Sequence, residues 1–323
     1  MRFKSSFRRL RDKAKIQIIR QCLNGRFKAS DAIILTSSPR SGSTLLSQIL
    51  SAIPKSCVLF EPLHIGRVPE AEKAGFSWRT YVDPEIDWPE GATFLRRVFE
   101  GRVINDWTSC EMSVGIAYNA EKLIVKFVRA NRLLPWICNS FTIPAPIFLI
   151  RHPCAVIASQ IKYGWDNAKY APESPPYLDI YPSFRSALEQ LNSDVEYLAA
   201  LWALDQLPVL LQNAPTPWIM ITYEELCLRP QRTIERISSR LNLNLDLECA
   251  LANLKTPSSV VSSSGISGVN GWKRQLTREQ ITKILQTINK FGITFYSDQD
   301  EADYESLYGV KTADHIKSTG YSS

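Results

Sequence analysis

Five short apolar runs constrain the fold of this 323-residue chain more than any other feature of its sequence. They cover residues 32–35, 58–60, 123–125, 147–150 and 218–221. Each run is short enough to be a buried strand, and helical patterns separate most of them. Because buried strands that alternate with helices are typical of a parallel sheet covered on both faces, the sequence predicts a three-layer α/β/α fold.

Two helices beyond the fifth run carry their own boundary signals. Pro230 begins a helical pattern that continues to Leu241, and proline is favoured in the first turn of a helix. Thr277 and Gln280 form a capping box ahead of a second pattern, which predicts a helix that continues through Lys290.

The domain organisation follows from composition and periodicity. With 45% apolar residues the chain can bury a large core, and one domain is predicted over residues 31–296. Within it, residues 65–120 and 163–183 are rich in Pro, Trp and Tyr and poor in periodicity, so we expect irregular insertions around the ligand-bearing edge of the sheet. Residues 297–323 are polar and predict a loosely held tail.

The net charge of +6 is concentrated in a basic leader, residues 1–30, whose ten Lys/Arg and one Asp leave a charge of −3 on the rest. A nearly neutral body implies no nucleic-acid surface. The leader's longest apolar run is two residues, so it is predicted to be neither a signal peptide nor a spanning helix. It is expected to be helical, either solvated or docked on the core. The alternative is a reversible contact with an anionic membrane surface.

Cysteine and histidine usage bears on the compartment and on metals. Seven cysteines without any C-x-x-C pair indicate reduced thiols, as in the cytoplasm. The three histidines, His64, His152 and His315, are far apart in the sequence. The protein is therefore predicted to be cytoplasmic, peripheral at a membrane if the leader binds one, and to hold no metal.

The stretch after the first apolar run, "LTSSPRSGST" at residues 35–44, resembles a phosphate-binding loop. Against the pattern G-x-x-x-x-G-K-[ST], Ser37 replaces the first glycine and Ser43 replaces the lysine, while Arg40 supplies a cation. The amides that open the following helix still point, with the helix dipole, at any anion in the turn. The residues expected to hold that anion are Pro39, Arg40, Ser41, Gly42, Ser43 and Thr44.

Two motifs together resemble the PAPS-dependent sulfotransferases, where PAPS is 3′-phosphoadenosine 5′-phosphosulfate and PAP its desulfated product. "SPRSGSTLL" is similar to the phosphosulfate loop of that family. "FLIRHPCAVIAS" is similar to its second nucleotide motif, with Arg151 at a strand end, Pro153 opening a helix and Ser159 eight residues after the arginine. A guanidinium can grip a phosphate through two oxygens while a neighbouring hydroxyl takes a third. The resemblance implies a sulfotransferase fold with a P-loop-like sheet, and a 3′-phosphate on Arg151 and Ser159.

The resemblance extends over most of residues 30–290. It places Tyr223, in "YEELCLRP", near the adenine and makes Lys273 of the late glycine-rich segment a candidate for the nucleotide. Ser263 and Ser264 stand where many cytosolic members carry Arg-Lys, so this chain departs from the family pattern there.

Sulfuryl transfer needs a base near the acceptor oxygen and positive charge on the departing phosphate. Glu61 follows the second run, and its Glu-Pro pair resembles that of Golgi carbohydrate and some bacterial sulfotransferases, so it is the predicted base. His64 is the competing candidate because cytosolic members use histidine. Arg40 is expected beside the departing phosphate. Lys126 interrupts the apolar residues at the end of the third predicted strand. It is expected to contact the sulfuryl group, as the resemblance to tyrosylprotein sulfotransferases implies.

The leading hypothesis is thus a metal-independent enzyme that moves a sulfuryl group from PAPS to an acceptor hydroxyl, with carbohydrate favoured by the Glu-Pro resemblance. A P-loop kinase and a catalytically inactive PAP-binding module are the alternatives. Seven aromatic residues crowd the two insertions and are expected to be mostly core: Trp78, Tyr81, Trp88, Trp107, Trp165, Tyr170 and Tyr177.

Overall fold

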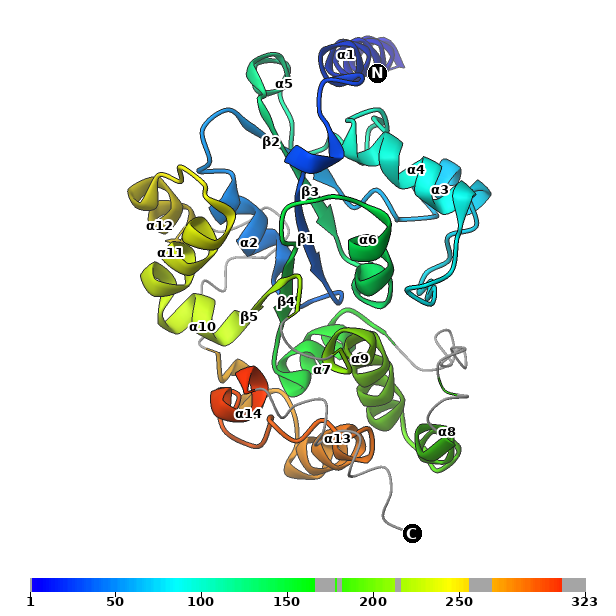
Figure 1. Cartoon of the computed structure of the whole chain (residues 1–323), viewed down its shortest axis with the longest axis vertical. Coiled ribbons are helices and arrows are strands. Elements are labelled where there is room, and N and C mark those ends of the chain that lie inside the picture. The colour runs from blue at the N-terminus through cyan, green and yellow to red at the C-terminus, as the bar shows by residue number, and fades with distance from the viewer. Residues whose placement is uncertain (1, 166–177, 179–181, 213–215, 256–268, 310–323) are drawn as a thin grey trace.

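The computed structural model describes residues 2–165, 178, 182–212, 216–255 and 269–309 (Figure 1). Its centre is one five-stranded sheet in the order β2-β3-β1-β4-β5, and every neighbouring pair is parallel. The strands are β1 Ile33–Ser37, β2 Ser56–Phe60, β3 Lys122–Phe127, β4 Ile147–Ile150 and β5 Ile219–Thr222. Each of the five apolar runs overlaps one of these strands, which confirms the predicted parallel α/β fold.

Helices surround the sheet on both faces and at the edge where its strands end (Figure 1). They are α1 Arg2–Leu23, α2 Ser43–Leu50, α3 Pro69–Lys73, α4 Pro89–Phe99, α5 Val114–Asn119, α6 Leu134–Ser140, α7 Pro153–Lys162, α8 Pro182–Glu189, α9 Asp194–Leu210, α10 Tyr223–Leu228, α11 Pro230–Leu241, α12 Leu247–Lys255, α13 Arg278–Lys290 and α14 Tyr304–Tyr308. Short 3-10 turns cover Ala29–Asp31, Asn131–Leu133 and Gly271–Arg274. The two helices with predicted boundaries, α11 and α13, occur as expected, and the Thr277 capping box is formed.

The two faces of β1 show how the layers form. Ile33 and Leu35 join an apolar core with residues of α2, α11 and α12. Ile34, between them, joins a second core with residues of α1, α4 and α6 on the opposite face. Because successive strand residues point to opposite faces, a continuously apolar strand is buried on both sides. A third core, built mainly by α7, α9 and α13, also includes Phe148 and Ile150 of β4.

Two segments that were expected to be irregular or loosely held contain short helices. Residues 65–120 contain helices α3, α4 and α5, and α4 begins at Pro89 and buries Phe94 and Val98. Residues 297–309 are not loosely held, because α14 buries Leu307 in the third core. In both cases a short helix packs its few apolar residues against a neighbour, which composition alone did not reveal. The insertion predicted at 163–183 lies mostly outside the described residues, as do residues 310–323.

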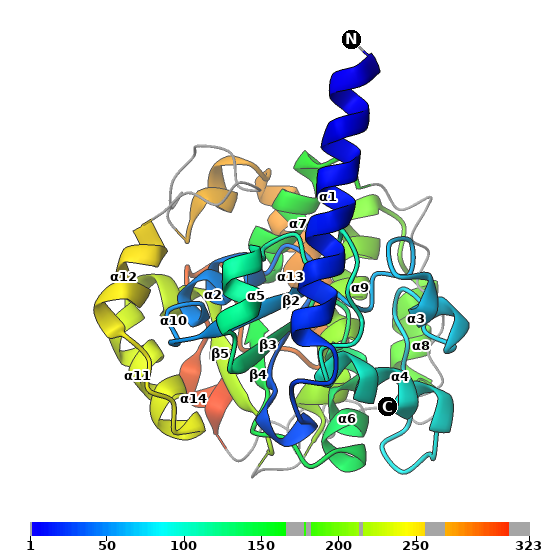
Figure 2. The same cartoon turned by 90° about the horizontal axis from the view of Figure 1, so that it is seen from above.

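The basic leader begins with helix α1, which projects from the body in Figure 2. At its carboxyl end Ile19 and Leu23 are fully buried in the second core, while Ile18 is 43% exposed. The leader is therefore helical and docked at that end, and a membrane contact stays a prediction. In the part of the chain that the structure describes, no helix combines the length and apolar character needed to cross a bilayer.

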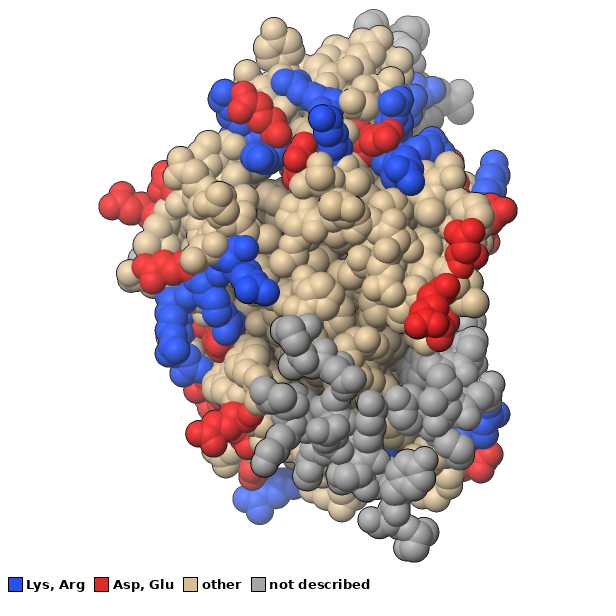
Figure 3. Space-filling view, viewed as in Figure 1, with Lys and Arg blue, Asp and Glu red and all other residues tan. Residues whose placement is uncertain are grey.

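Charged side chains of both signs lie around the rim of the face shown in Figure 3, and uncharged residues cover much of its centre. Over the described part of this face, lysine and arginine are interspersed with aspartate and glutamate rather than gathered in one stripe.

Candidate functional site

Most of the predicted site residues meet at one edge because all five strands are parallel. Glu61 directly follows β2, Arg151 follows β4 and Tyr223 follows β5, while Lys126 is the last but one residue of β3. The carboxyl ends of parallel strands share an edge, where open α/β sheets bind their ligands. The loop between β1 and α2 lies in the middle of that edge, since β1 is the central strand.

The loop turns sharply before α2. Gly42 adopts a φ of 95°, and a Cβ atom there would lie 2.3 Å from the Tyr223 ring, so only glycine fits both the backbone and the ring. Arg40 has a φ of 73°, a conformation that costs a non-glycine residue about 1–3 kcal/mol. The Ser41 hydroxyl is buried and has no hydrogen-bond partner among the described residues. The turn therefore holds a donor and helix amides that an anion could satisfy.

Buried amides anchor the start of this loop to α9. The Ser38 hydroxyl accepts hydrogen bonds from Gln206 Nε2 at 2.5 Å and from Asn131 Nδ2 at 3.2 Å. Asn131 Oδ1 in turn accepts from the Thr36 hydroxyl at 2.8 Å. A fully bonded buried network of this kind makes a loop rigid, so the anion turn is held before any ligand arrives.

On one side of the loop lies what we call the arginine–serine cluster, formed by Arg40, Arg151 and Ser159. Arg40 Nε donates to Ser159 Oγ at 2.9 Å, and Arg151 Nη1 donates to the Arg40 carbonyl at 3.1 Å. The guanidinium of Arg40 lies 4.0 Å from the centre of the Tyr163 ring, and that of Arg151 lies 4.1 Å from the centre of the Tyr223 ring. Arg151 Nε is buried without a hydrogen-bond partner among the described residues. The cluster therefore offers two fixed guanidiniums to an anion.

Arg151 is held by a buried support behind β4. The carboxylate of Glu224, fully buried, accepts a hydrogen bond from the His152 backbone amide at 3.0 Å. Burial raises the pKa of Glu224 to about 7. The His152 ring stacks on Trp272 at 4.6 Å and hydrogen-bonds the Ser297 carbonyl at 2.9 Å. Residues far along the chain thus fix the strand end from which Arg151 projects.

On the other side of the loop lies the Lys126 cluster, formed by Lys126, Glu61 and Arg129. Lys126 is 1% exposed, donates to the Thr44 hydroxyl at 2.9 Å and lies 4.0 Å from the centre of the Phe60 ring. Arg129 Nη1 lies 3.6 Å from a carboxylate oxygen of Glu61. Glu61 also has a positive φ of 40°, and its backbone amide donates to the Lys126 carbonyl at 2.9 Å. An ammonium from β3 thus reaches Thr44, the second residue of α2, although the loop has no lysine.

The Lys126 cluster shifts the titration of its members. Burial raises the pKa of Glu61, and the opposing charges of Lys126 and Arg129 limit that rise. Burial likewise lowers the pKa of Lys126, which the carboxylates of Glu111 and Glu61 counteract. A carboxylate with a raised pKa is a better proton acceptor, because catalytic bases work best near the ambient pH.

His64 lies three residues after Glu61 and between two tryptophans. Its ring centre is 4.9 Å from that of Trp78 and 4.8 Å from that of Trp107, both edge to face. His64 Nδ1 is buried and has no hydrogen-bond partner among the described residues. Burial and the charges of Arg129 and Arg67 lower the pKa of the imidazole, so it is neutral at pH 7. Both candidate bases therefore stay possible on geometry.

The structure does not bring every predicted residue to the loop. Lys273 pairs with Asp300, with 2.6 Å between the ammonium and the carboxylate, and its side chain is 40% exposed. Binding a phosphate there would have to compete with this ion pair. Ser263 and Ser264 lie outside the described residues. Arg40 was expected beside the departing phosphate, but it reaches Ser159 and so joins the residues expected at the 3′-phosphate.

Sequence reasoning missed Arg129, Tyr163 and Glu111. Arg129 follows Lys126 by three residues, just past the end of β3, and a second cation at a strand end was the available signal. Tyr163 follows Ser159 by four residues, which places both on one face at the end of α7. Glu111 approaches Lys126 only through the folding of residues 61–121, which no local pattern predicts.

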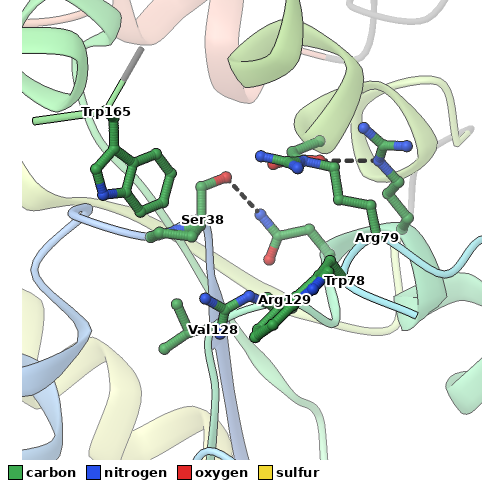
Figure 4. Close-up of a pocket in the computed structure, with 10 residues that line it drawn as sticks. Ser38, Trp78, Arg79, Val128, Arg129 and Trp165 are labelled. Atoms are coloured by element: carbon green, nitrogen blue, oxygen red, sulfur yellow. Dashed lines mark hydrogen bonds and ion pairs between the residues drawn. The ribbon is translucent and has the colours of Figure 1, made fainter. Parts of the chain in front are cut away.

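A cavity of about 160 Å³ adjoins the loop at Ser38 and Pro39 (Figure 4). Trp78, Arg79 and Arg129 line it from the insertion and from beyond β3, and Trp165 lines it from beyond α7. Among the described residues, no group of three or more His, Cys, Asp or Glu side chains is arranged to hold a metal ion.

The parallel sheet, the anion loop and the helix that follows it define a P-loop-like α/β protein. A model of the sulfotransferase family matches residues 32–246, more than half of the chain, and the chain belongs to that family.

The solved structures that this chain matches include the sulfotransferase domain of the Synechococcus olefin synthase, at 20% identity over 82% of this chain and 95% of that one, with a TM-score of 0.44. A mouse sulfotransferase crystallised with PAP has 15% identity over 92% of both chains, with a TM-score of 0.43. The sulfotransferase domain of the curacin biosynthetic pathway has 20% identity over 91% of this chain and 99% of that one, with a TM-score of 0.43. A comparison with curated proteins gives no significant match.

Proposed function

We propose that this sulfotransferase uses PAPS as its donor and transfers the sulfuryl group to an acceptor hydroxyl by in-line displacement without a metal ion. One observation carries the proposal. Two guanidiniums with a hydroxyl lie on one side of the loop, and a buried ammonium with a carboxylate lies on the other. This arrangement matches a nucleotide ligand that carries an anionic group at each end. One of these groups would react next to a base.

The residues around the loop fit PAPS. Arg151 and Ser159 would hold its 3′-phosphate, because the buried Nε atom of Arg151 lacks a partner that a phosphate oxygen could provide. The amides and hydroxyls of Ser41 to Thr44 would hold its 5′-phosphosulfate, and the ring of Tyr223 is available to the adenine. PAPS supplies a sulfuryl group on a phosphate leaving group, so the protein must neutralise charge on that phosphate.

The Lys126 cluster then supplies the remaining chemistry. Glu61 takes the proton from the acceptor hydroxyl, and Arg129 orients its carboxylate through their ion pair. Lys126, fixed by Thr44, places its positive charge where negative charge grows in the transition state. His64 is the alternative base. The resemblance of Glu61-Pro62 to the Glu-Pro pair of carbohydrate sulfotransferases favours a carbohydrate acceptor.

Titration of the purified protein with PAP and with ATP–magnesium tests the donor. We expect PAP to bind tightly with EDTA present, and radiolabelled PAPS to transfer its sulfuryl group to a hydroxyl acceptor. Preference for ATP with magnesium would overturn the proposal in favour of a P-loop kinase. PAP binding without transfer to any hydroxyl compound would instead favour an inactive PAP-binding module.

A further inference from the structure

The cavity beside the loop has charged and aromatic walls (Figure 4). Arg79, Arg129, Arg132 and Asp205 bring charge to it, and Trp78 and Trp165 bring rings. A volume of about 160 Å³ resembles that of engineered cavities that hold a benzene ring, so the cavity admits one small ring or a chain of similar size.

Among the described residues of the cavity wall, arginine side chains outnumber the carboxylates that pair with them. Arg132 Nε donates to Asp205 Oδ1 at 2.8 Å, and Arg79 Nε lies 3.6 Å from that same oxygen. Arg129 pairs with Glu61. Among the described residues, Arg79 and Arg132 thus share one carboxylate, which leaves one positive charge of this pair in excess.

The excess charge lies in a poorly solvated place. Arg132 is 3% exposed, and the Arg79 and Asp205 side chains are 18% and 11% exposed. Arg132 Nη2 and Arg79 Nε are both buried without a hydrogen-bond partner among the described residues. Buried guanidinium N–H groups without an acceptor are costly, and Asp205 neutralises only one of the two charges, so an anion that enters the cavity would be favoured.

The cavity is also next to the proposed chemistry. Ser38 and Pro39 of its wall belong to the anion loop, and Arg129 of its wall pairs with the proposed base Glu61. An acceptor in the cavity would therefore lie next to the loop and next to the arginine that pairs with the proposed base. The 3′-phosphate has its own guanidiniums in the arginine–serine cluster, on Arg40 and Arg151.

We propose that the acceptor carries a singly charged anionic group, such as a carboxylate, which binds Arg79 and Arg132 while its ring or chain packs on Trp78. The inference rests on the proposed function, because it names the acceptor class of the same site. One anionic group balances the excess charge, and the single shared carboxylate of Asp205 leaves guanidinium donors free to bind it.

Matched acceptors test this inference. The enzyme is incubated with PAPS and pairs that differ only in charge: para-(hydroxymethyl)benzoic acid and its primary amide, and methyl glucopyranosiduronic acid and its primary amide. Sulfated products are quantified by mass spectrometry. We expect kcat/KM for an acid to exceed that for its amide by about 10- to 150-fold, the scale of a charge-assisted hydrogen bond.

Arginine variants then locate the preference. In Arg132→Gln the ratio of acid to amide should fall about tenfold or more while the Kd for PAP stays within about twofold. Arg79→Gln should lower the same ratio. Because the Arg79 side chain is less buried, this variant can still be measured if Arg132→Gln folds poorly. Arg240→Gln, an exposed arginine on α11 away from the cavity, is the matched control and should leave the ratio unchanged.

Each outcome decides one question. Equal turnover of acids and amides, or a preference that survives both arginine variants, would overturn the inference and leave the proposed function intact. A loss of PAP affinity in Arg132→Gln would assign the cavity to the donor instead. Failure to sulfate any pair while PAP still binds would count against anionic acceptors. Failure with no PAP binding would count against the proposed function.

Discussion

The arginine–serine cluster and the Lys126 cluster lie on either side of one loop, yet they differ in whether a carboxylate lies beside their cationic side chains. Arg40 and Arg151 hydrogen-bond uncharged oxygens and lie over tyrosine rings. Lys126 and Arg129 instead lie close to Glu61, whose carboxylate offsets part of their charge. The first cluster is therefore suited to receive an anion, whereas the second neutralises part of its own charge and contains a carboxylate that could exchange a proton. A donor-binding role and a catalytic role should separate when each cluster is mutated.

The largest expected effect comes from the catalytic side. Glu61→Gln keeps the shape of the side chain but cannot accept a proton, so kcat should fall by about 10²- to 10⁴-fold. The Kd for PAP should stay nearly unchanged, as measured by calorimetry. Normal turnover in this variant would show that Glu61 is not the base. Both clusters would then be assigned to ligand binding.

The pH profile of the wild-type enzyme sharpens the same contrast. A general base works only when deprotonated, so kcat/KM should fall as the pH drops through the pKa of the base. For Glu61 that limb should lie above the ordinary value of about 4.3, because burial raises its pKa. For His64 it would lie below about 6.5, because burial lowers that pKa. Because these two pKa values shift toward each other, the pH profile of kcat/KM should be compared between the wild-type enzyme and the His64→Asn variant.

On the donor side, Arg151→Ala should weaken PAP binding by about 1.5–3 kcal/mol, the scale of a lost charged hydrogen bond. Arg40→Ala should weaken it similarly, because Arg40 hydrogen-bonds Ser159 in the same cluster. Calorimetric titration with PAP measures both variants. An unchanged affinity in Arg151→Ala would contradict its assignment to the 3′-phosphate.

His64→Asn should have a smaller effect. If the imidazole only orients the neighbouring groups, losing it should cost about tenfold or less in kcat, as for other supporting partners of a site. Steady-state kinetics beside Glu61→Gln provide the comparison. A nearly inactive His64→Asn enzyme together with an active Glu61→Gln enzyme would make histidine the base.

The smallest expected effect is that of metal removal. On the proposed function, Lys126 and the loop amides supply the positive charge that magnesium supplies in kinases, so treatment with EDTA should leave turnover unchanged. The assay compares initial rates with EDTA and with added magnesium. Strict dependence on magnesium would return the P-loop kinase to first place.

Local sequence predicted the donor side more fully than the acceptor side. Arg151, Pro153 and Ser159 belong to one strand-to-helix unit of nine residues, so their spacing already encodes their arrangement. Glu61 and Lys126 were predictable because each lies at the end of a recognisable strand. Glu111, Arg132 and Asp205 were not, since they approach the site from separate elements.

Apolar periodicity and short motifs act over a few neighbouring residues, so they predict the parallel sheet, the anion loop and the strand ends that carry Glu61, Lys126, Arg151 and Tyr223. The contacts of Arg40 with Ser159, of Lys126 with Thr44, and of Arg79 and Arg132 with Asp205 become visible only in the folded protein. These contacts join side chains that lie tens of residues or more apart in the chain. Their charges can be matched only after packing has excluded water and fixed which groups meet.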